Sequence, residues 1–506
     1  MILRLQGGIS GLRATLSYCC LVVDASHFVT SAHARTWRVP TDVPTVQAGI
    51  DSAQAGDDVL LAPGSYTWTS EGAVQFSMLT IAKPGLTLHS EAGAGATTLD
   101  AEFEGRVLRC LDVGGLVIEG LTFRNGSATL DVPVNTPGTA THGKFGGGIY
   151  ATGNSQPTIR SCMFVGNSAV GSGANDFGGA INCGMATIDG CTFLDNRAGN
   201  NAGNGFGGAI HSAAAVIRNC YFARNISSGD HSAGGGAVMS FGASITDCVF
   251  EDNETGAFLG AGGGGVLEAD GGSVTRCTFM RNRASASNQG CNSGGLSISR
   301  GTVSHCLFIE NHARAAFTAV ARGGALGCGS TTVSECVFIA NRAYHVAPDG
   351  PGYGGAIAVG TQASIVTTIR NCTLVGNSGE TQGVGGIFFF RGPGAVERSI
   401  ISGTVGQTCS GVDGWQGIWQ CSNLFGNSQG DTICGSDDGS NFTANPQFCA
   451  VDPAGSFNIQ IQDDSPCAPG NHPDGNPCGL IGAGPVGCGS VSVQNHSWGH
   501  IKDLYR

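Results

Sequence analysis

Carboxylate side chains are densest between residues 251 and 270 of this 506-residue chain. Glu251, Asp252 and Glu254 are followed by Glu268 and Asp270, which belong to the next unit of the repeat described below. Hard cations such as Ca²⁺ bind oxygen ligands of this kind, but the spacing of these residues matches no established ligand loop. Because their oxygen atoms could still bind such a cation, a weak Ca²⁺ site is the one cofactor site that these residues allow. We nominate no catalytic residue and no other metal or cofactor site.

Three other groups of reactive residues are better explained by structure than by chemistry. The run Gly260–Gly265 is similar to a phosphate-binding loop, but it opens no helix. His211 and His305 occupy different positions of the repeat described below, so we expect them not to share a metal ion. The seven Cys residues from Cys409 to Cys488 contain no Cys-x-x-Cys pair, which argues against zinc and favours disulfides. Their odd number leaves one Cys either free or paired with an outlier such as Cys372.

The elements that position these residues belong to a repeat of Ile or Val, two residues, Cys, one residue, Phe, two residues and Asn, which recurs eight times. Its Cys positions are Cys162, Cys191, Cys220, Cys248, Cys277, Cys306, Cys336 and Cys372. Degenerate copies have Leu121 and Ser399 in place of Cys. A Gly-Gly step separates successive copies, and the period is 28 to 30 residues over most of the array. Such a period predicts a solenoid, because one unit cannot bury its own apolar side.

Each unit alternates apolar and polar residues in short runs broken by Gly, Asn and Asp, which is typical of strands. We therefore predict an all-β, right-handed parallel β-helix with three short strands per coil. Pairs such as Asp189-Gly190 and Arg218-Asn219 precede each Cys and suit a corner with left-handed backbone angles. Stacking the coils in register predicts a buried Phe column, a Cys column of inert thiols and an inward Asn ladder.

Two segments resemble known families. The string from Val46 to Tyr66 resembles the entry helix and first strand of pectin-lyase-like β-helices, in which a short helix plugs the open end of the core. The repeats at 146–377 are similar to those of the chlamydial polymorphic outer-membrane proteins. Together these resemblances cover roughly residues 40–400. They imply the fold and are uninformative about chemistry.

The chain divides by composition into four regions. Residues 1–34 are predicted to be a signal peptide, with Ala32-His33-Ala34 as the cleavage motif. Residues 35–400 form the predicted β-helix, residues 401–489 the Cys-rich last coils and C-terminal cap, and residues 490–506 a tail. The density of Cys favours an oxidising location, either extracellular or at a bacterial cell surface. The formal net charge of −12 disfavours nucleic acid, and no transmembrane segment is expected.

Enzymes of the pectin-lyase-like fold place charged residues on the outer face of one sheet, so a related enzyme should have charged residues in the corresponding column. The outward column of the first strand is predicted to contain Tyr150, Asn182, His211, Met239, Leu267, Gly327, Ala358 and Phe388. This set contains no carboxylate, Arg or Lys. The charged residues of the second-strand corner, Arg160, Asp189, Arg218 and Arg370, are expected to be a solvated surface.

The sequence therefore favours a secreted or cell-surface structural and binding protein, similar to an adhesin, without catalytic activity. Its predicted partner is a carbohydrate or a cell-surface protein. The alternative is a polysaccharide-active enzyme, similar to a pectate lyase or a glycoside hydrolase, with its site in irregular loops such as Gly126–Lys144 and Tyr344–Tyr353. On the uncharged column we predict no cleavage of polygalacturonate.

Overall fold

The protein is described here by a computed structural model. It covers residues 34–488, except 74–75, 129–143, 172–174, 201–202, 259–260, 263–264, 266, 289, 348–350, 361–365, 413–416 and 450–457. The predicted signal peptide up to residue 33, the tail 490–506 and most of the loop Gly126–Lys144 lie outside the described residues. Within the described part, no helix is long and apolar enough to cross a membrane.

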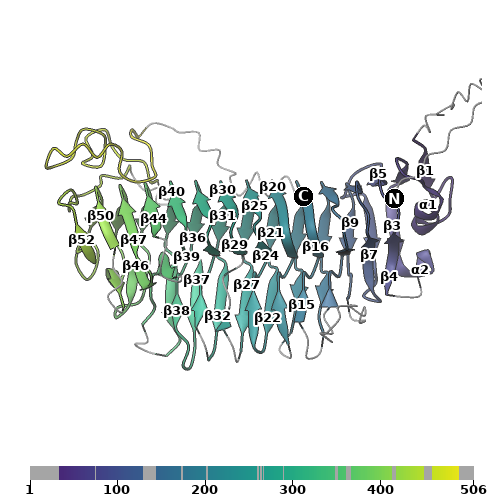
Figure 1. The fold of residues 1–506 in the computed structure, drawn as a ribbon, viewed down its shortest axis with the longest axis horizontal. Helices are drawn as coiled ribbons and strands as arrows, with labels where there is room; N and C mark the ends of the chain where they lie inside the picture. The colour runs from purple at the N-terminus through teal and green to yellow at the C-terminus, as the bar shows by residue number, and fades with distance from the viewer. Residues whose placement is uncertain are drawn as a thin grey trace, which may run out of the picture. The chain divides into compact units, whose positions relative to one another are not determined.

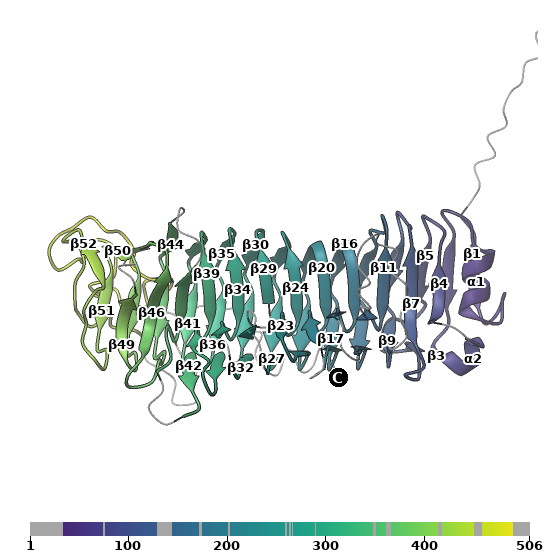
Figure 2. The same ribbon diagram turned by 60° about the horizontal axis from the view of Figure 1, so that its bottom comes forward.

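The predicted parallel β-helix is confirmed. Each strand pairs in parallel with the equivalent strand of the next coil, as Ile149 pairs with Ile181 and Ile181 with Ile210. Figures 1 and 2 show the strands of successive coils side by side along the stack.

The first two strands of each coil form two ladders, which are joined where β16 and β20 run through both. The first-strand ladder contains β4 (Ser77–Ile81), β7 (Arg106–Leu111), β11 (Ile149–Thr152), β16 (Ile181–Asp189), β20 (Ile210–Arg218), β24 (Val238–Phe241), β29 (Leu267–Asp270), β34 (Leu296–Ser299), β39 (Leu326–Gly329), β43 (Ile357–Gly360), β46 (Val384–Arg391) and β49 (Gln407–Gly411). The second-strand ladder contains β1 (Thr36–Val39), β2 (Asp58–Leu61), β5 (Thr87–Ser90), β8 (Val117–Glu119), β12 (Thr158–Arg160), β25 (Ser244–Thr246), β30 (Ser273–Thr275), β35 (Thr302–Ser304), β40 (Thr332–Ser334), β44 (Thr367–Arg370), β47 (Gly394–Glu397), β50 (Gly417–Gln420) and β52 (Gly435–Asp437).

The third strand of each coil carries the Cys-x-Phe motif and forms a sheet of its own. Its members are β3 (Gly64–Thr67), β6 (Thr97–Asp100), β9 (Thr122–Arg124), β13 (Met163–Val165), β17 (Thr192–Leu194), β21 (Tyr221–Ala223), β26 (Val249–Glu251), β31 (Thr278–Met280), β36 (Leu307–Ile309), β41 (Val337–Ile339), β45 (Thr373–Val375), β48 (Ile400–Ser402) and β51 (Asn423–Phe425).

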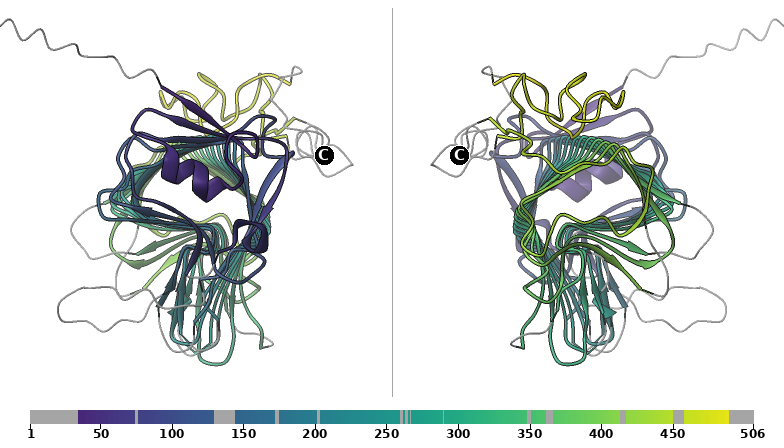
Figure 3. Two further views of the ribbon diagram at one scale, coloured as in Figure 1. Left: turned by 90° about the vertical axis from the view of Figure 1, so that its right-hand side faces the viewer. Right: turned by 90° about the vertical axis from the view of Figure 1, so that its left-hand side faces the viewer.

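Two further strands per coil follow the Asn position in the central coils, in addition to the three strands that the repeat predicted. We call them together the fin, and Figure 3 shows it projecting from the body of the coils. Its outgoing strands are β14 (Ser168–Ala169), β18 (Arg197–Ala198), β22 (Ile226–Gly229), β27 (Glu254–Ala257), β32 (Arg283–Ala286), β37 (His312–Ala315) and β42 (Arg342–His345). Its returning strands are β10 (Lys144–Phe145), β15 (Asn175–Phe177), β19 (Asn204–Phe206), β23 (Ser232–Gly234), β28 (Ala261–Gly262), β33 (Cys291–Asn292) and β38 (Ala321–Arg322).

The core of the coils contains the three predicted columns. Rings of the Phe column stack from Phe123 to Phe338 with centroids 4.7 to 4.9 Å apart, and they are fully buried. Each Asn side chain donates to the next, as Asn225 Nδ2 does to Asn253 Oδ1 at 2.9 Å. It also donates to a main-chain carbonyl, as Asn225 Nδ2 does to Phe193 O. The ladder therefore leaves few buried polar atoms without partners.

The coils turn at residues with left-handed backbone angles, as predicted. Gly190, Asn219 and Asp247 precede their Cys residues with φ between 55° and 61°. The Gly-Gly step is equally constrained, because a Cβ on Gly178 (φ 63°) would lie 2.0 Å from the carbonyl oxygen of Ile181. These turns let the main chain enter the next strand without strain.

The N-terminal helix covers the end of the core, as the resemblance to pectin-lyase-like proteins implied. Helix α1 (Val46–Ser52) has Thr45 as its N-cap and buries Val46 and Ile50. Gly49 faces Val39 and Val59 of the first coils. Figure 3 shows α1 lying across the coil opening, and the short helix α2 (Trp68–Glu71) lies beside β3.

The Cys-rich segment after residue 442 packs on the flank of the last coils. Ile461, Cys467 and Ile481 form a small apolar cluster with Ile400 of β48. Main-chain hydrogen bonds add to this contact, including one from Gly482 N to Arg398 O at 2.8 Å. The segment therefore covers the outer side of the third-strand sheet.

Candidate functional site

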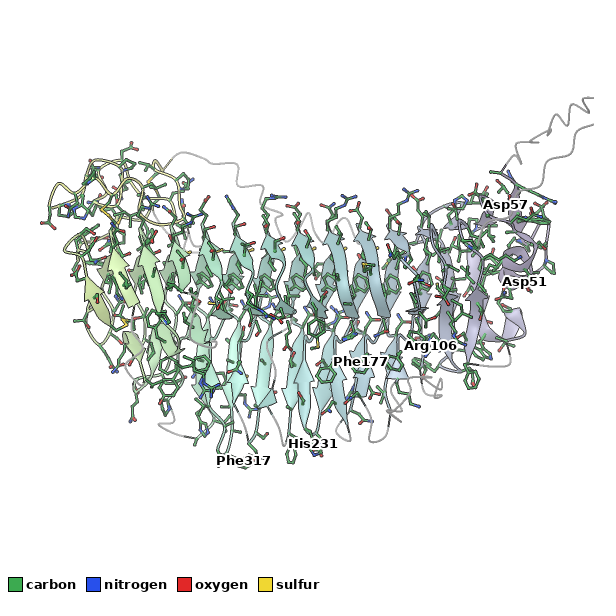
Figure 4. The ribbon with its side chains drawn as sticks, viewed as in Figure 1. Asp51, Asp57, Arg106, Phe177, His231 and Phe317 are labelled. Atoms are coloured by element: carbon green, nitrogen blue, oxygen red, sulfur yellow. A yellow bond between two sulfur atoms is a disulfide. The ribbon has the colours of Figure 1, made fainter. Side chains whose placement is uncertain are left out.

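The candidate site is the inner corner where the returning strands of the fin meet the first-strand ladder. We call it the fin corner. The ladder contributes Arg109, Tyr150, Asn182, His211, Met239, Glu268, Ser297, Gly327, Ala358 and Phe388, which are equivalent positions of successive strands. The fin contributes Phe145, Phe177, Phe206, Gly234, Asn292, Arg322 and the following Tyr353. Arg106 and Phe177, labelled in Figure 4, lie along this junction.

The register of the ladder corrects the predicted uncharged column. Leu267 pairs with Val238 and Leu296 and is fully buried, so it faces the core. Its neighbour Glu268 pairs with Met239 and faces outward. The prediction was one residue out because Val266 stands where other coils have Ala, as Ala237 precedes Val238.

The same register extends the column beyond its predicted end. Arg109 pairs with Tyr150 and brings a cation into the column. The expectation of a column without carboxylate, Arg or Lys was therefore wrong.

Aromatic side chains occupy the N-terminal half of the fin corner. The Phe145 ring stacks on Tyr150 and on Phe177, with centroids 5.3 and 5.4 Å apart. Phe177 in turn lies 5.4 Å from Phe206 and 4.7 Å from the ring of His211. All of these side chains except His211 come from apolar or weakly polar residue types, and each remains partly exposed. The corner therefore presents a row of ring edges to solvent.

His211 is held as a neutral imidazole. Burial lowers the pKa of His211 to about 4. The amide Nδ2 of Asn182 lies 3.0 Å from His211 Nδ1, where it donates to the unprotonated ring nitrogen. His211 therefore carries its proton on Nε2 and can donate one hydrogen bond.

Glu268 leans towards the position where the aromatic row of the fin is interrupted. The row Phe145, Phe177, Phe206 continues with Gly234, and a Cβ on Gly234 would lie 2.1 Å from Glu268 Oε2. Within the described residues, no hydrogen bond or ion pair joins the Glu268 carboxyl to another side chain. Burial raises the pKa of Glu268 to about 7. A carboxyl group with this pKa can both give and take a proton at neutral pH.

Two arginines lie at the N-terminal end of the fin corner. Arg106 is 1% exposed, and its Nε donates to the carbonyls of Phe145 and Gly146 at 2.9 and 2.8 Å. Burial lowers the pKa of Arg106 to about 10. The buried Nε of Arg109 has no hydrogen-bond partner among the described residues.

A small cavity of about 80 Å³ lies at the C-terminal end of the fin corner. Asn292 and Arg322 line it from the fin, and Ser297 and Phe390 line it from the first-strand ladder. We call it the Arg322 pocket. Beside it, the rings of Tyr353 and Phe388 lie 4.7 Å apart.

The predicted Ca²⁺ ligands do not converge. Glu251 accepts a hydrogen bond from Tyr221 and forms an ion pair with Arg281 on the third-strand side of the coil. Asp252 also pairs with Arg281. Asp270 pairs with Arg300 at a different corner, while Glu268 lies in the fin corner. No cluster of three His, Cys, Asp or Glu residues suited to a metal is found in the described ranges.

The charged residues of the second-strand corner pair from coil to coil. Arg160 lies 2.7 Å from Glu119, and Asp189 lies 3.0 Å from Arg218. These pairs are exposed, so each contributes about 0–1 kcal/mol. His305 belongs to this corner, 2.7 Å from Glu335, and it is separate from His211 as predicted. Of the predicted Gly260–Gly265 loop, residues 260, 263 and 264 lie outside the described residues.

The cysteines fall into the two predicted classes. The eight column thiols are buried and unpaired. Burial raises the pKa of several of them, including Cys162 and Cys220, which disfavours the reactive thiolate. The C-terminal cysteines form the disulfides Cys409–Cys434, Cys421–Cys478 and Cys449–Cys488. Cys467 is the free member of that group, and it is buried.

Comparison with known proteins identifies no family for this chain. No protein-family model matches the chain, and no curated protein matches it. A solved structure described as a new PL6 alginate lyase in complex with a trisaccharide is similar over 93% of this chain and 99% of its own. The identity is 11% and the TM-score is 0.37, so the likeness carries no argument about this chain.

Proposed function

We propose that this protein is a secreted or cell-surface carbohydrate-binding protein that holds a glycan chain along the fin corner. The observation that carries the proposal is the composition of that corner, where a row of aromatic rings is followed along the stack by polar groups and then by a second aromatic pair. Carbohydrate sites combine apolar contact surface with a few polar groups that fix orientation. The three disulfides support an oxidising, extracellular location.

The polar atoms of the corner favour a ligand over a bare surface. The buried Nε atoms of Arg109 and Arg322 and the Oδ1 of Asn292 have no hydrogen-bond partner among the described residues. Leaving such an atom unpaired costs about 1–3 kcal/mol. Sugar hydroxyl groups, which both donate and accept, are able to supply these bonds.

A panel of immobilised neutral and acidic polysaccharides, probed with the purified protein, tests the proposal. We expect binding to at least one polysaccharide and a loss of roughly tenfold or more in affinity for Phe177→Ala. Phe317→Ala is the matched control, because Phe317 is 72% exposed and lies outside the fin corner. Circular dichroism establishes that both variants fold. Absence of any glycan binding, or equal binding by Phe177→Ala, would refute the proposal.

Polysaccharide cleavage is a second candidate function, and Glu268 is the observation that favours it. A carboxyl with a pKa near 7 suits general acid–base catalysis, and its place in the corner would bring it to a bound chain. Incubation of the bound polysaccharide with wild-type protein and with Glu268→Gln, followed by assays for reducing ends and for unsaturated products, separates the two functions. Turnover that Glu268→Gln abolishes would establish an enzyme.

A further inference from the structure

The Arg322 pocket contains two polar atoms that the protein leaves unpaired. Asn292 of β33 and Arg322 of β38 are partners in neighbouring parallel strands, so their side chains emerge on the same face about 4.8 Å apart along the stack. The Oδ1 of Asn292 and the Nε of Arg322 are both buried, and neither has a hydrogen-bond partner among the described residues. Asn292 Oδ1 requires a hydrogen-bond donor, and Arg322 Nε–H requires an acceptor.

The guanidinium of Arg322 is held in place by its surroundings. Its carbon lies 4.9 Å from the centre of the Phe390 ring, which restrains the side chain through a cation–π contact. The terminal Nη1 lies close to Gly290, where a Cβ would approach it to 2.7 Å. The cation is therefore positioned before any ligand arrives.

No ion pair compensates the charge of Arg322 within the described part of the chain. Burial, followed by the nearby Arg391, lowers the pKa of Arg322, although the group stays protonated at neutral pH. Among the residues that the structure describes, no carboxylate lines the cavity. Arg276 and Arg300 on the coils differ in this respect, since Arg276 is paired with Asp247 and Arg300 with Asp270.

We propose that the Arg322 pocket binds the anionic substituent of an acidic glycan, either a carboxylate or a sulfate ester, with a neighbouring sugar hydroxyl donating to Asn292. This inference rests on the proposed function and names its substrate class. The guanidinium supplies Nε–H and a terminal N–H in the geometry that suits two oxygens of one anion. Asn292 Oδ1 accepts no bond from a bare anion, so a hydroxyl beside the charge distinguishes a sugar derivative from an inorganic ion.

Matched oligosaccharides that differ in charge alone test the inference by titration calorimetry. The first pair is an oligogalacturonate and its methyl ester, and the second is a sulfated galactan oligosaccharide and its desulfated form. We expect the wild-type protein to bind one charged member at least tenfold more tightly than its neutral partner. Whichever pair shows the preference identifies the anion as carboxylate or sulfate.

Variants assign the preference to the pocket. In Arg322→Gln the two members of the preferred pair should bind within about threefold of each other. Arg314→Gln, which removes a cation from the outgoing sheet of the fin, should keep the wild-type preference. Thermal denaturation provides a second readout, because removal of a half-buried cation without a carboxylate partner should leave the melting temperature of Arg322→Gln unchanged or higher.

The outcomes separate the two proposals. Equal binding of charged and neutral members, or a preference that persists in Arg322→Gln, overturns the anionic subsite. If Phe177→Ala still weakens binding in that case, the proposed carbohydrate function stands without it. Failure of every oligosaccharide and polysaccharide to bind overturns both.

Discussion

A carboxyl group that leans into an apolar corner is costly to ionise, and Glu268 is in that position. Its carboxyl takes the space left by Gly234 in a row of aromatic residues, and burial raises its pKa to about 7. Residues with perturbed pKa values cluster at functional sites, because catalytic acids and bases need pKa values matched to their task. The corner therefore combines a titrating group with positioned cations, of which Arg322 is one.

The pKa of Glu268 predicts how stability depends on pH. The unfolded chain ionises this group near pH 4.5 and the folded chain near pH 7. Between these values the folded state binds more protons, so the contribution of neutral Glu268 is complete below about pH 4.5 and is lost as the pH rises through 7. The melting temperature of Glu268→Gln minus that of the wild-type protein should therefore be larger at pH 8 than at pH 5. The exposed Glu104→Gln is the control, and an equal difference for Glu268→Gln at both pH values would contradict the prediction.

Phe250→Ala tests the Phe column. Phe250 is fully buried between Phe222 and Phe279, so we expect a loss of roughly 3–5 kcal/mol. Because coils contact mainly their neighbours, hydrogen exchange should accelerate in the adjacent coils more than at the ends of the stack. Phe241→Ala, in the same coil but 49% exposed, should change stability little. A uniform effect over all coils would show that the stack unfolds as one unit.

At the scale of the element, ladders of identical side chains hold the coils in register. A slip by one residue would turn each Phe outward and each Asn ladder bond would be lost. The fin has a different core, made of small residues such as Ala284, Ala313 and Ala343. Small side chains let its two sheets approach closely, and the returning strands can then face the first-strand ladder.

The Cys ladder should remain reduced. Thiols in adjacent parallel strands point the same way, which is poor geometry for a disulfide. We expect none of the thirteen free thiols of the described residues to react with a maleimide in the native protein, and all of them to react after denaturation without reductant. Peptide mapping before and after reduction locates the disulfides. A bridge between Cys220 and Cys248 would show that the ladder oxidises.

At the scale of the whole molecule, the β-helix and the C-terminal segment are stabilised differently. The body has a continuous apolar core and coil-to-coil hydrogen bonds. The Cys-rich segment after residue 442, which we call the flank segment, has a small apolar cluster around Ile461 and Ile481. Two of the three disulfides, Cys421–Cys478 and Cys449–Cys488, involve it. Small units with little core depend on such covalent links.

Reduction should therefore loosen the flank segment before the body. In the presence of a reductant we expect limited proteolysis to cut after residue 442, while the far-ultraviolet circular dichroism of the β-helix is retained. The non-reduced protein is the control. Loss of the β-sheet signal on reduction would mean that the disulfides hold the body as well.

Sequence alone determined the coil fold, because each coil needs a buried ring, a ladder amide and a left-handed corner at the same positions of the repeat. Phe164 and its equivalents predicted the buried column, Asn167 and its equivalents the amide ladder, and Asn219 a left-handed corner. The short helix at Val46 was predictable from its apolar spacing. These features depend on neighbours within one coil or in the next, so a periodic sequence encodes them.

Tertiary structure alone decided the fin and the candidate site. Fin strands such as Ser168–Ala169 are too short, and their side chains too small, to give an alternating signal. The orientation of Glu268 depended on which of two adjacent apolar residues, Val266 or Leu267, faced the core, and inter-strand register decided it. Asn292, Arg322 and Phe390 meet only because stacking brings different coils and the fin together. A polar atom left unpaired by that packing has no signature in the order of the residues.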